Sequence, residues 1–141
     1  MKKLQDWVSR FEKVVLDAEN KEFDWVEHNC FTFASQCFEA ITGQSLVAEA
    51  PKITSKRKAL SIMSKYDGIE GCLLAVAEIF GLAEVSPLFA KRGDPVLVEL
   101  DGEQLFATVD LTGRGVLVIR DDGLGLIRLE LSEIKRAWSI T

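Results

Sequence analysis

Hydrophobic residues recur at steps of three and four along the first part of the chain, a spacing typical of helices with one buried face. Between residues 3 and 19 this stripe is continuous, which predicts an amphipathic helix. Its members are Leu4, Trp7, Val8, Phe11, Val14, Val15 and Ala18. The opposite face carries charges of both signs, so we expect this helix to pack on the core of a domain rather than on a membrane or a partner.

A second helix is predicted between Asn29 and Gly43. Asparagine is a favourable N-cap residue, and glycine suits the position just after a helix end. Apolar side chains surround most of the segment, which indicates a helix at the centre of the domain. Cys30 falls in its first turn, where backbone N–H groups and the helix dipole favour a thiolate. The same position also suits a partly buried thiol with no reactive role.

Two further helices are predicted before the pattern changes. Ser55 can cap a helix over about residues 56–66, and residues 69–80 again show helical spacing. Cations gather on the outer face of the first of these helices: Lys56, Arg57, Lys58 and Lys65. We interpret this face as solvated, with a small patch for an anionic ligand as the alternative. Residues 44–54 lack a sustained period and include a proline, so they are predicted to form a loop.

From about Lys91 the pattern changes to short apolar runs separated by turn residues, which indicates antiparallel strands. Asp101-Gly102 is a hairpin signal between the first two runs. The predicted strands are residues 95–100, 104–110, 116–120, 124–131 and 137–140, with further turns at residues 112–115 and 122–123.

Helices followed by strands are typical of an α+β domain. We expect one domain over residues 1–141, because a chain of this length needs only one core. Its mainly helical half is residues 1–90, and its sheet half, residues 91–141, holds an antiparallel sheet of five or six strands. Closing that sheet into a small barrel would remove its edges.

Composition narrows the classes of function. Hydrophobic residues make up 48% of the chain and charged residues 28%, as in ordinary globular proteins. The net charge of −5 argues against a nucleic-acid partner, since phosphate binding usually needs a clustered basic face. No apolar run approaches the length of a membrane span, and the first residues lack the core of a signal peptide. We therefore expect a cytoplasmic protein with no membrane association.

Three cysteines and one histidine limit the chemistry of the chain. Cys30 and Cys37 lie about 10 Å apart along the axis of the predicted helix, too far for a disulfide. A zinc site built from His28, both of these cysteines and Cys72 would contain no C-x-x-C pair and matches no common finger spacing. We expect reduced cysteines, no metal and no cofactor. Cys30 should be more reactive than Cys37 or Cys72, which should both be buried.

Three short motifs resemble a known family. They are the W-V-E-H-N-C sequence of residues 25–30, the R-G-D sequence of residues 92–94 before the first strand, and the A-W pair of residues 137–138. Together they resemble the NlpC-type cell-wall cysteine peptidases of the papain-like superfamily. The pattern is more similar still to a small phage and prophage family of unknown function with that fold. The resemblance covers about residues 23–140 and implies a papain-like fold, with N-terminal helices packed on the sheet.

The resemblance makes Cys30 the counterpart of the peptidase nucleophile. The binding residues that it implies are Trp25, Asn29 and Asp94. Asn29 replaces the aspartate that usually precedes the cysteine. The general base of the peptidases is a histidine at the start of the second strand, which here falls at residues 104–106, and no histidine is there. His28 is the one histidine that could act as a base, if the loop before the helix folded back over Cys30.

Two functions from different classes follow. The first is a non-catalytic or vestigial papain-like domain that serves as a structural or assembly protein of a phage or prophage particle, with tail or other prophage proteins as partners. The second is a cysteine hydrolase that cleaves peptide or amide bonds in cell-wall material, with Cys30 as nucleophile and His28 as base. The missing strand histidine favours the first, so we expect no efficient peptidase activity. A third reading, an antitoxin-like or immunity partner, suits a small acidic domain, but no residue points to it.

Overall fold

The structure is a computed structural model, which describes residues 1–46, 53–120 and 125–141. Its helices are α1 (Trp7–Glu19), α2 (Cys30–Thr42), α3 (Lys56–Lys65) and α4 (Gly68–Phe80). Its strands are β1 (Ala83–Val85), β2 (Pro95–Leu100), β3 (Glu103–Val109), β4 (Gly115–Arg120), β5 (Gly125–Glu130) and β6 (Ile134–Ser139). Two 3-10 turns are η1 (Pro87–Phe89) and η2 (Leu131–Glu133). The predicted α+β class is confirmed. The middle of the predicted 44–54 loop and the predicted turn at residues 122–123 lie outside the described residues.

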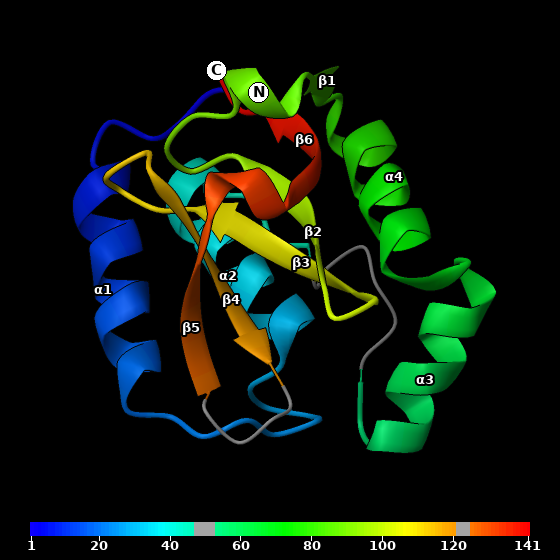
Figure 1. Cartoon of the computed structure of the whole chain (residues 1–141). Helices are drawn as coiled ribbons and strands as arrows, with labels where there is room; N and C mark the ends of the chain where they lie inside the picture. The colour runs from blue at the N-terminus through cyan, green and yellow to red at the C-terminus, as the bar shows by residue number, and fades with distance from the viewer. Residues whose placement is uncertain (47–52, 121–124) are drawn as a thin grey trace.

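The six strands form one antiparallel sheet in the order β1-β6-β2-β3-β4-β5 (Figure 1). Five of them come from the predicted sheet half, and the sixth, β1, precedes it. Sequence analysis missed β1 because a run of three residues carries no readable alternation, and it forms by pairing with β6, with Glu84 opposite Trp138. Among the described residues no pairing joins β1 to β5, so these two strands are the edges and the sheet is not closed into a barrel by backbone hydrogen bonds.

The β2–β3 hairpin confirms the turn predicted at Asp101-Gly102. Both residues have positive φ, 51° and 78°, as the two-residue turn that matches strand twist requires. The turn fixes the register, with Leu100 opposite Glu103 and Pro95 opposite Thr108. It therefore decides which side chains at the start of β3 face the helices.

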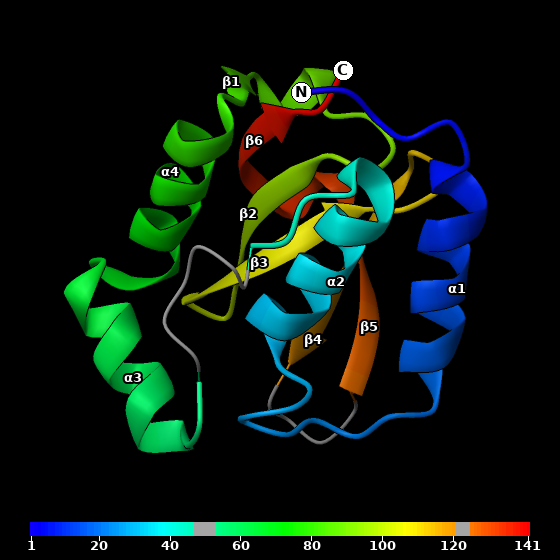
Figure 2. The ribbon, with the colours of Figure 1, turned by 180° about the vertical axis from the view of Figure 1, so that it is seen from behind.

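Two clusters of buried side chains lie on opposite faces of the sheet. The larger one joins α1, α2 and α4 to strand residues such as Leu97 and Phe106. The smaller one contains the alternate strand residues, among them Val96, Val98 and Leu105, and its buried members include no helix residue. Because both faces are covered, the strands read as continuous apolar runs rather than as a strict alternation. Figure 2 shows α2 between α1 and α4, in the central position predicted from its apolar circumference.

The N-terminus of α2 is a complete capping box. The Asn29 side chain accepts a hydrogen bond from the Thr32 backbone N–H at 2.9 Å, and the Thr32 hydroxyl accepts one from the Asn29 N–H at 2.8 Å. Gly43 ends the helix with φ 78°.

The predicted helix over residues 3–19 begins only at Trp7, because Leu4 donates its N–H to the carbonyl of Ile41 at 2.7 Å instead of entering the helix. None of the described helices is long and apolar enough to cross a membrane.

Candidate functional site

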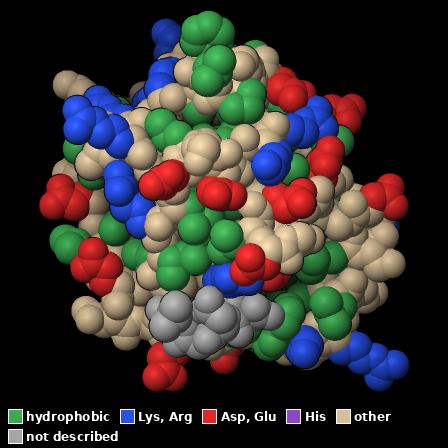
Figure 3. All heavy atoms as spheres, viewed as in Figure 1, with side chains coloured by type: hydrophobic (Ala, Val, Ile, Leu, Met, Phe, Trp, Pro, Cys, Tyr) green, Lys and Arg blue, Asp and Glu red, His purple; other side chains and the backbone are tan. Residues whose placement is uncertain are grey.

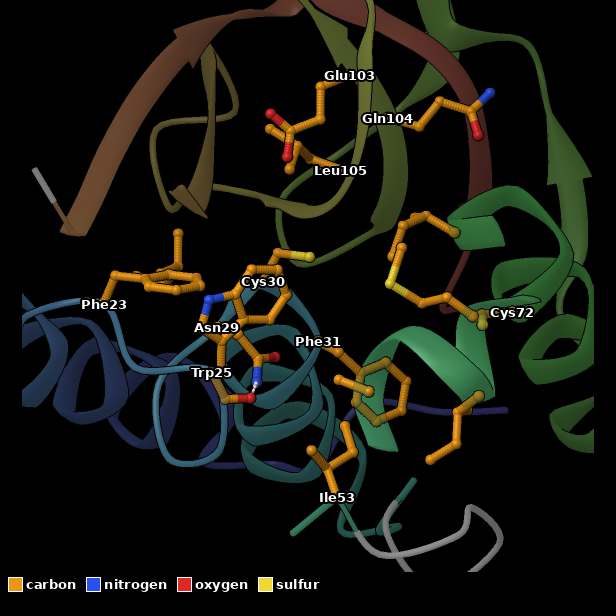
Figure 4. A pocket seen from close by; sticks show the side chains of 15 residues that line it. Phe23, Trp25, Asn29, Cys30, Phe31, Ile53, Cys72, Glu103, Gln104 and Leu105 are labelled. Atoms are coloured by element: carbon orange, nitrogen blue, oxygen red, sulfur yellow. Dashed lines mark hydrogen bonds between the residues drawn. The ribbon is translucent and has the colours of Figure 1, made fainter. Parts of the chain in front are cut away.

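A pocket of about 110 Å³ opens beside the first turn of α2, and we call it the Cys30 pocket. Figure 4 shows its side chains, which come from the loop before α2, from α2, α3 and α4, from the segment before α3, from the start of β3 and from β4. Most of them are apolar: Phe23, Trp25, Phe31, Ile53, Ala59, Ile62, Met63, Ile69, Leu105 and Ile119. The others are Asn29, Cys30, Cys72, Glu103 and Gln104. A cavity of about 150 Å³ can hold benzene, so the pocket has room for roughly one apolar side chain.

Cys30 is the first residue of α2, as predicted, and its side chain lines the pocket. Cys30 is half-buried, and desolvation together with a smaller contribution from the Glu103 carboxylate raises the pKa of its thiol to about 11. Hydrogen bonds from the backbone of Phe106 and Phe31 lower the pKa of the thiol, but by less than burial raises it. The thiol is therefore neutral near pH 7. Desolvation outweighs the helix dipole on which the expectation of a thiolate rested.

The other two cysteines differ from each other. Cys37 is fully buried in the larger core, as predicted, and burial moves the pKa of its thiol far above the ordinary value. Cys72 is only half-buried, so the prediction that it is buried is wrong. Its position on α4 turns it toward the Cys30 pocket, where α4 meets α3 and β3. The greater reactivity predicted for Cys30 stays a prediction.

His28 is not among the residues that line the pocket. It is 2% exposed, and its ring packs edge-on against Phe33 with ring centroids 6.4 Å apart. Two backbone hydrogen bonds with Asp24, of 2.8 and 3.0 Å, hold it in a closed loop. Within the described part of the chain neither ring nitrogen has a hydrogen-bond partner. Burial, and to a lesser extent the charge of Lys21, lower the pKa of the ring, which is therefore neutral.

The positions where the resemblance requires a general base are occupied by other groups. Gln104 lines the pocket and donates its amide N–H to Glu70 Oε2 at 3.2 Å. Glu70 in turn pairs with Arg136 at 3.0 Å. Leu105 and Phe106 point into the two hydrophobic clusters on either face of the sheet. None of these side chains exchanges a proton near neutral pH.

Trp25 and Asn29 form one wall of the pocket. The Asn29 side chain donates to the Trp25 carbonyl at 2.8 Å while its oxygen caps α2, so one residue fixes both the helix end and the loop (Figure 4). The Trp25 ring packs edge-on against Phe23, with centroids 5.2 Å apart, and Lys56 Nζ lies 4.9 Å from the ring centroid. Sequence reasoning named Trp25 and Asn29 but missed Phe23, whose only signal is its place in the same aromatic loop.

Asp94 lies away from the pocket and is completely buried. Its carboxylate accepts the backbone N–H of Lys91 at 3.0 Å and that of Ile140 at 3.1 Å, and it pairs with Lys91 Nζ at 3.4 Å. These bonds tie the start of β2 to the residue that follows β6, and we call them the Asp94 anchor. The preceding Gly93 has φ 86° and lies against Trp7. At this position Asp94 therefore serves the fold, and its binding role stays a prediction.

No group of three or more His, Cys, Asp or Glu side chains among the described residues is arranged to hold a metal ion. The cations of α3 are exposed, which agrees with the interpretation of a solvated face. The chemistry at the pocket is thus that of two neutral thiols, Cys30 and Cys72, one carboxylate, two amides and an apolar wall.

Comparison with known proteins gives one family. Neither the curated proteins nor the solved structures include a match to the chain. One family model, described as a domain of unknown function (DUF6950), matches residues 2–140. Because that match covers nearly the whole sequence, the chain belongs to the DUF6950 family.

Proposed function

We propose that this chain is a non-catalytic domain of the NlpC-like, papain-like kind, and that its Cys30 pocket binds an apolar side chain of another protein. One observation carries the proposal. The thiol at the start of α2 lines an apolar pocket, and at the start of β3, where the resemblance requires a histidine, the residue that lines the same pocket is Gln104, which exchanges no proton near neutral pH.

Amide hydrolysis by a cysteine needs a thiolate and a proton donor for the departing nitrogen. With a pKa of about 11, the Cys30 thiol is almost entirely protonated at pH 7. The Gln104 amide cannot take up or release a proton in this range. The Glu103 carboxylate opposes ionisation of the thiol, because its charge raises the Cys30 pKa. These features suit a binding pocket better than an active site.

The biological setting that we propose follows from the sequence resemblance. A phage or prophage family with this motif pattern suggests a structural or assembly protein, associated with the tail or with other prophage proteins. Such a protein would act in the cytoplasm during assembly or within the particle. A pocket that accepts one side chain of a neighbour is a suitable assembly device, because a single buried anchor can dominate an interface.

A cysteine hydrolase is the alternative, and one observation favours it. The backbone of Phe31 and Phe106 bonds to the Cys30 sulfur, and backbone N–H groups of this kind can stabilise an oxyanion. His28 would then have to leave its site beside Phe33 and reach the pocket. That movement would break the two backbone hydrogen bonds between Asp24 and His28.

Thiol titration and a hydrolysis assay test the proposal together. Iodoacetamide labelling of folded protein, followed by mass mapping, gives the Cys30 rate as a function of pH. We expect it to rise with pH to beyond pH 10 without a plateau at neutral pH. We also expect no release of product from peptidoglycan fragments or short peptides above the level of Cys30→Ala. Turnover that is lost in both Cys30→Ala and His28→Ala, with the circular dichroism spectrum unchanged, would overturn the proposal in favour of the hydrolase.

A further inference from the structure

His28 is a buried histidine whose ring makes no hydrogen bond. Its side chain is 2% exposed, and neither ring nitrogen has a hydrogen-bond partner among the described residues. On the face drawn in Figure 3, the described side chains show no histidine at the surface, in agreement with this burial. Buried polar groups nearly always have a hydrogen-bond partner, so this exception calls for an explanation. The proposed function by itself gives the ring no role.

Nothing among the described neighbours of the ring would stabilise a positive charge on it. From α2, Phe33 packs against it edge-on. From its own loop, the Asp24 carboxylate already accepts two backbone N–H groups, at 2.9 and 2.8 Å, and the side chains of Glu22 and Glu27 are exposed. Burial and the charge of the nearby Lys21 both lower the pKa of the ring. A protonated ring held here would therefore have two N–H donors and a charge without partners.

The same residue closes the turn that carries one wall of the Cys30 pocket. The Asp24 N–H donates to the His28 carbonyl at 2.8 Å, and the His28 N–H donates to the Asp24 carbonyl at 3.0 Å. We call residues 24–28 the His28 turn. Trp25 lies within it, and its carbonyl accepts a hydrogen bond from the Asn29 side chain at 2.8 Å. Figure 4 shows Trp25 beside Cys30, so the His28 turn holds an aromatic ring at the pocket.

The His28 turn can open while α2 stays folded. The cap of α2 is made between Asn29 and Thr32, and its hydrogen bonds use no group of residues 24–28. Opening the turn breaks the two backbone bonds between its ends and the bond from Asn29 to the Trp25 carbonyl. A local opening that breaks so few bonds needs far less free energy than global unfolding.

We propose that His28 is a pH switch of the Cys30 pocket: when the ring takes up a proton from solvent, the His28 turn opens and Trp25 leaves the pocket wall. The charged ring is then hydrated instead of buried against Phe33. A ligand that lies against Trp25 is released, because the pocket loses an aromatic side. This inference rests on the proposed function only for the identity of that ligand, an apolar side chain, since the opening itself needs no ligand.

The direction of the pH dependence follows from proton binding. The open turn binds the proton with the ordinary histidine pKa of about 6.5, whereas burial lowers the pKa of the ring in the closed turn. Proton uptake therefore favours the open turn as the pH falls below about 6.5. Between pH 7.5 and pH 5.5 the ratio of open to closed turn should rise by up to about tenfold.

Hydrogen exchange of the full chain, read by NMR at a series of pH values and corrected for the intrinsic exchange rates, tests the inference. The N–H groups of Asp24 and His28 report the turn, and those of β2 and β3 report global unfolding. We expect lower protection factors in the turn than in these strands. The turn values should fall by up to about tenfold from pH 7.5 to pH 5.5. Because the chain has one histidine, its ring signals give the titration midpoint directly.

His28→Phe removes the switch, with His28→Gln as a second variant should the first fail to fold by circular dichroism. In either variant the protection of the Asp24 N–H should not change between these pH values. Lys21→Met keeps the histidine but removes a nearby cation, so opening should shift to higher pH. In the wild type the indole N–H signal of Trp25 should move with the His28 midpoint, whereas that of Trp138 in the core should not.

Three outcomes overturn the inference. A ring that titrates while the turn keeps its protection has rotated out alone. Equal protection in the turn and in β2 and β3 means that only global unfolding exposes the ring. The same pH response in His28→Phe assigns it to another group.

Benzene, observed by NMR, is the probe of the apolar pocket. Its binding should weaken from pH 7.5 to pH 5.5 in the wild type and stay constant in His28→Phe. Constant binding in both proteins would show that the turn does not control the pocket. Opening of the turn without benzene binding at either pH would confirm the switch and count against the proposed binding pocket, so the two failures are distinguishable.

Discussion

The Asp94 anchor and the Cys30 pocket occupy positions that look equally functional in the sequence, yet their polar groups are used differently. The Asp94 carboxylate is fully buried and accepts hydrogen bonds from two backbone groups that the fold would otherwise leave unpaired. The pocket instead presents a neutral thiol and an apolar wall to the outside. The comparison teaches that a buried polar group whose hydrogen bonds are all made within the protein stabilises the fold. A ligand can bind instead where side chains line a cavity that is open to solvent.

The largest expected effect is at the anchor. Asp94→Ala removes the acceptor of the Lys91 and Ile140 N–H groups and leaves the buried Ile140 N–H without a partner, so we expect the free energy of unfolding to fall by about 3 kcal/mol. Urea unfolding measures it. Asp101→Ala, at an exposed hairpin turn, is the control and should cost far less. An equal loss in the two variants would contradict the role of the anchor.

Gly93→Ala should have the next largest effect on stability. At φ 86° an added Cβ would lie 3.2 Å from both Ile41 and Trp7, so strain and crowding act together. We expect a loss of about 2 kcal/mol. Gly102→Ala is a matched control, since its φ of 78° is similar but nothing lies within 4 Å of the added carbon. If thermal unfolding gives the same loss for both, crowding at Gly93 contributes nothing.

On the pocket side, Asn29→Ala should cost about 1 kcal/mol, the usual value of an N-cap. The substitution also removes the hydrogen bond from Asn29 to the Trp25 carbonyl. Asn29→Asp separates the two roles, because a carboxylate caps α2 but cannot donate to that carbonyl. We expect Asn29→Asp to regain most of the stability in urea unfolding. A loss as large as that of Asn29→Ala would show that the bond to Trp25 matters more than the cap.

Stability should depend on pH through His28. Its pKa is lowered in the folded state by burial, so the unfolded chain binds the proton more readily. The free energy of unfolding should therefore begin to fall as pH drops below the unfolded pKa of about 6.5, with a slope that approaches 1.4 kcal/mol per pH unit until the folded ring also titrates. His28→Phe should lack this dependence below about pH 6.5, where the unfolded His28 begins to bind a proton. Urea unfolding at a series of pH values measures both proteins. The same dependence of the unfolding free energy on pH in wild type and His28→Phe would contradict the role of His28.

The smallest expected effect is electrostatic and acts within the pocket. The Glu103 carboxylate raises the Cys30 pKa, so Glu103→Gln should shift the pH profile of Cys30 alkylation to lower pH. The rate at Cys37, which lies in the core and shows no influence from Glu103, is the internal control. An unchanged Cys30 profile would mean that the carboxylate is screened from the thiol.

Much of the fold was predictable because its signals are local. A cap and a stop residue at Asn29 and Gly43 fixed α2, and Asp101-Gly102 fixed the central hairpin, since each depends only on the conformations that a few neighbouring residues can adopt. Local signals failed for β1, which exists only because β6 lies beside it, and for the start of α1, where Leu4 bonds to Ile41 instead.

The candidate site shows the same division. The sequence by itself determined that Cys30 begins a helix and that no histidine stands at the start of β3. Only the tertiary structure decided that this thiol is neutral, that Cys72 joins its pocket, that His28 packs against Phe33 and that Asp94 is an internal anchor. The physical reason is that burial, pKa and hydrogen-bond partners depend on residues from distant parts of the chain, which the fold brings together.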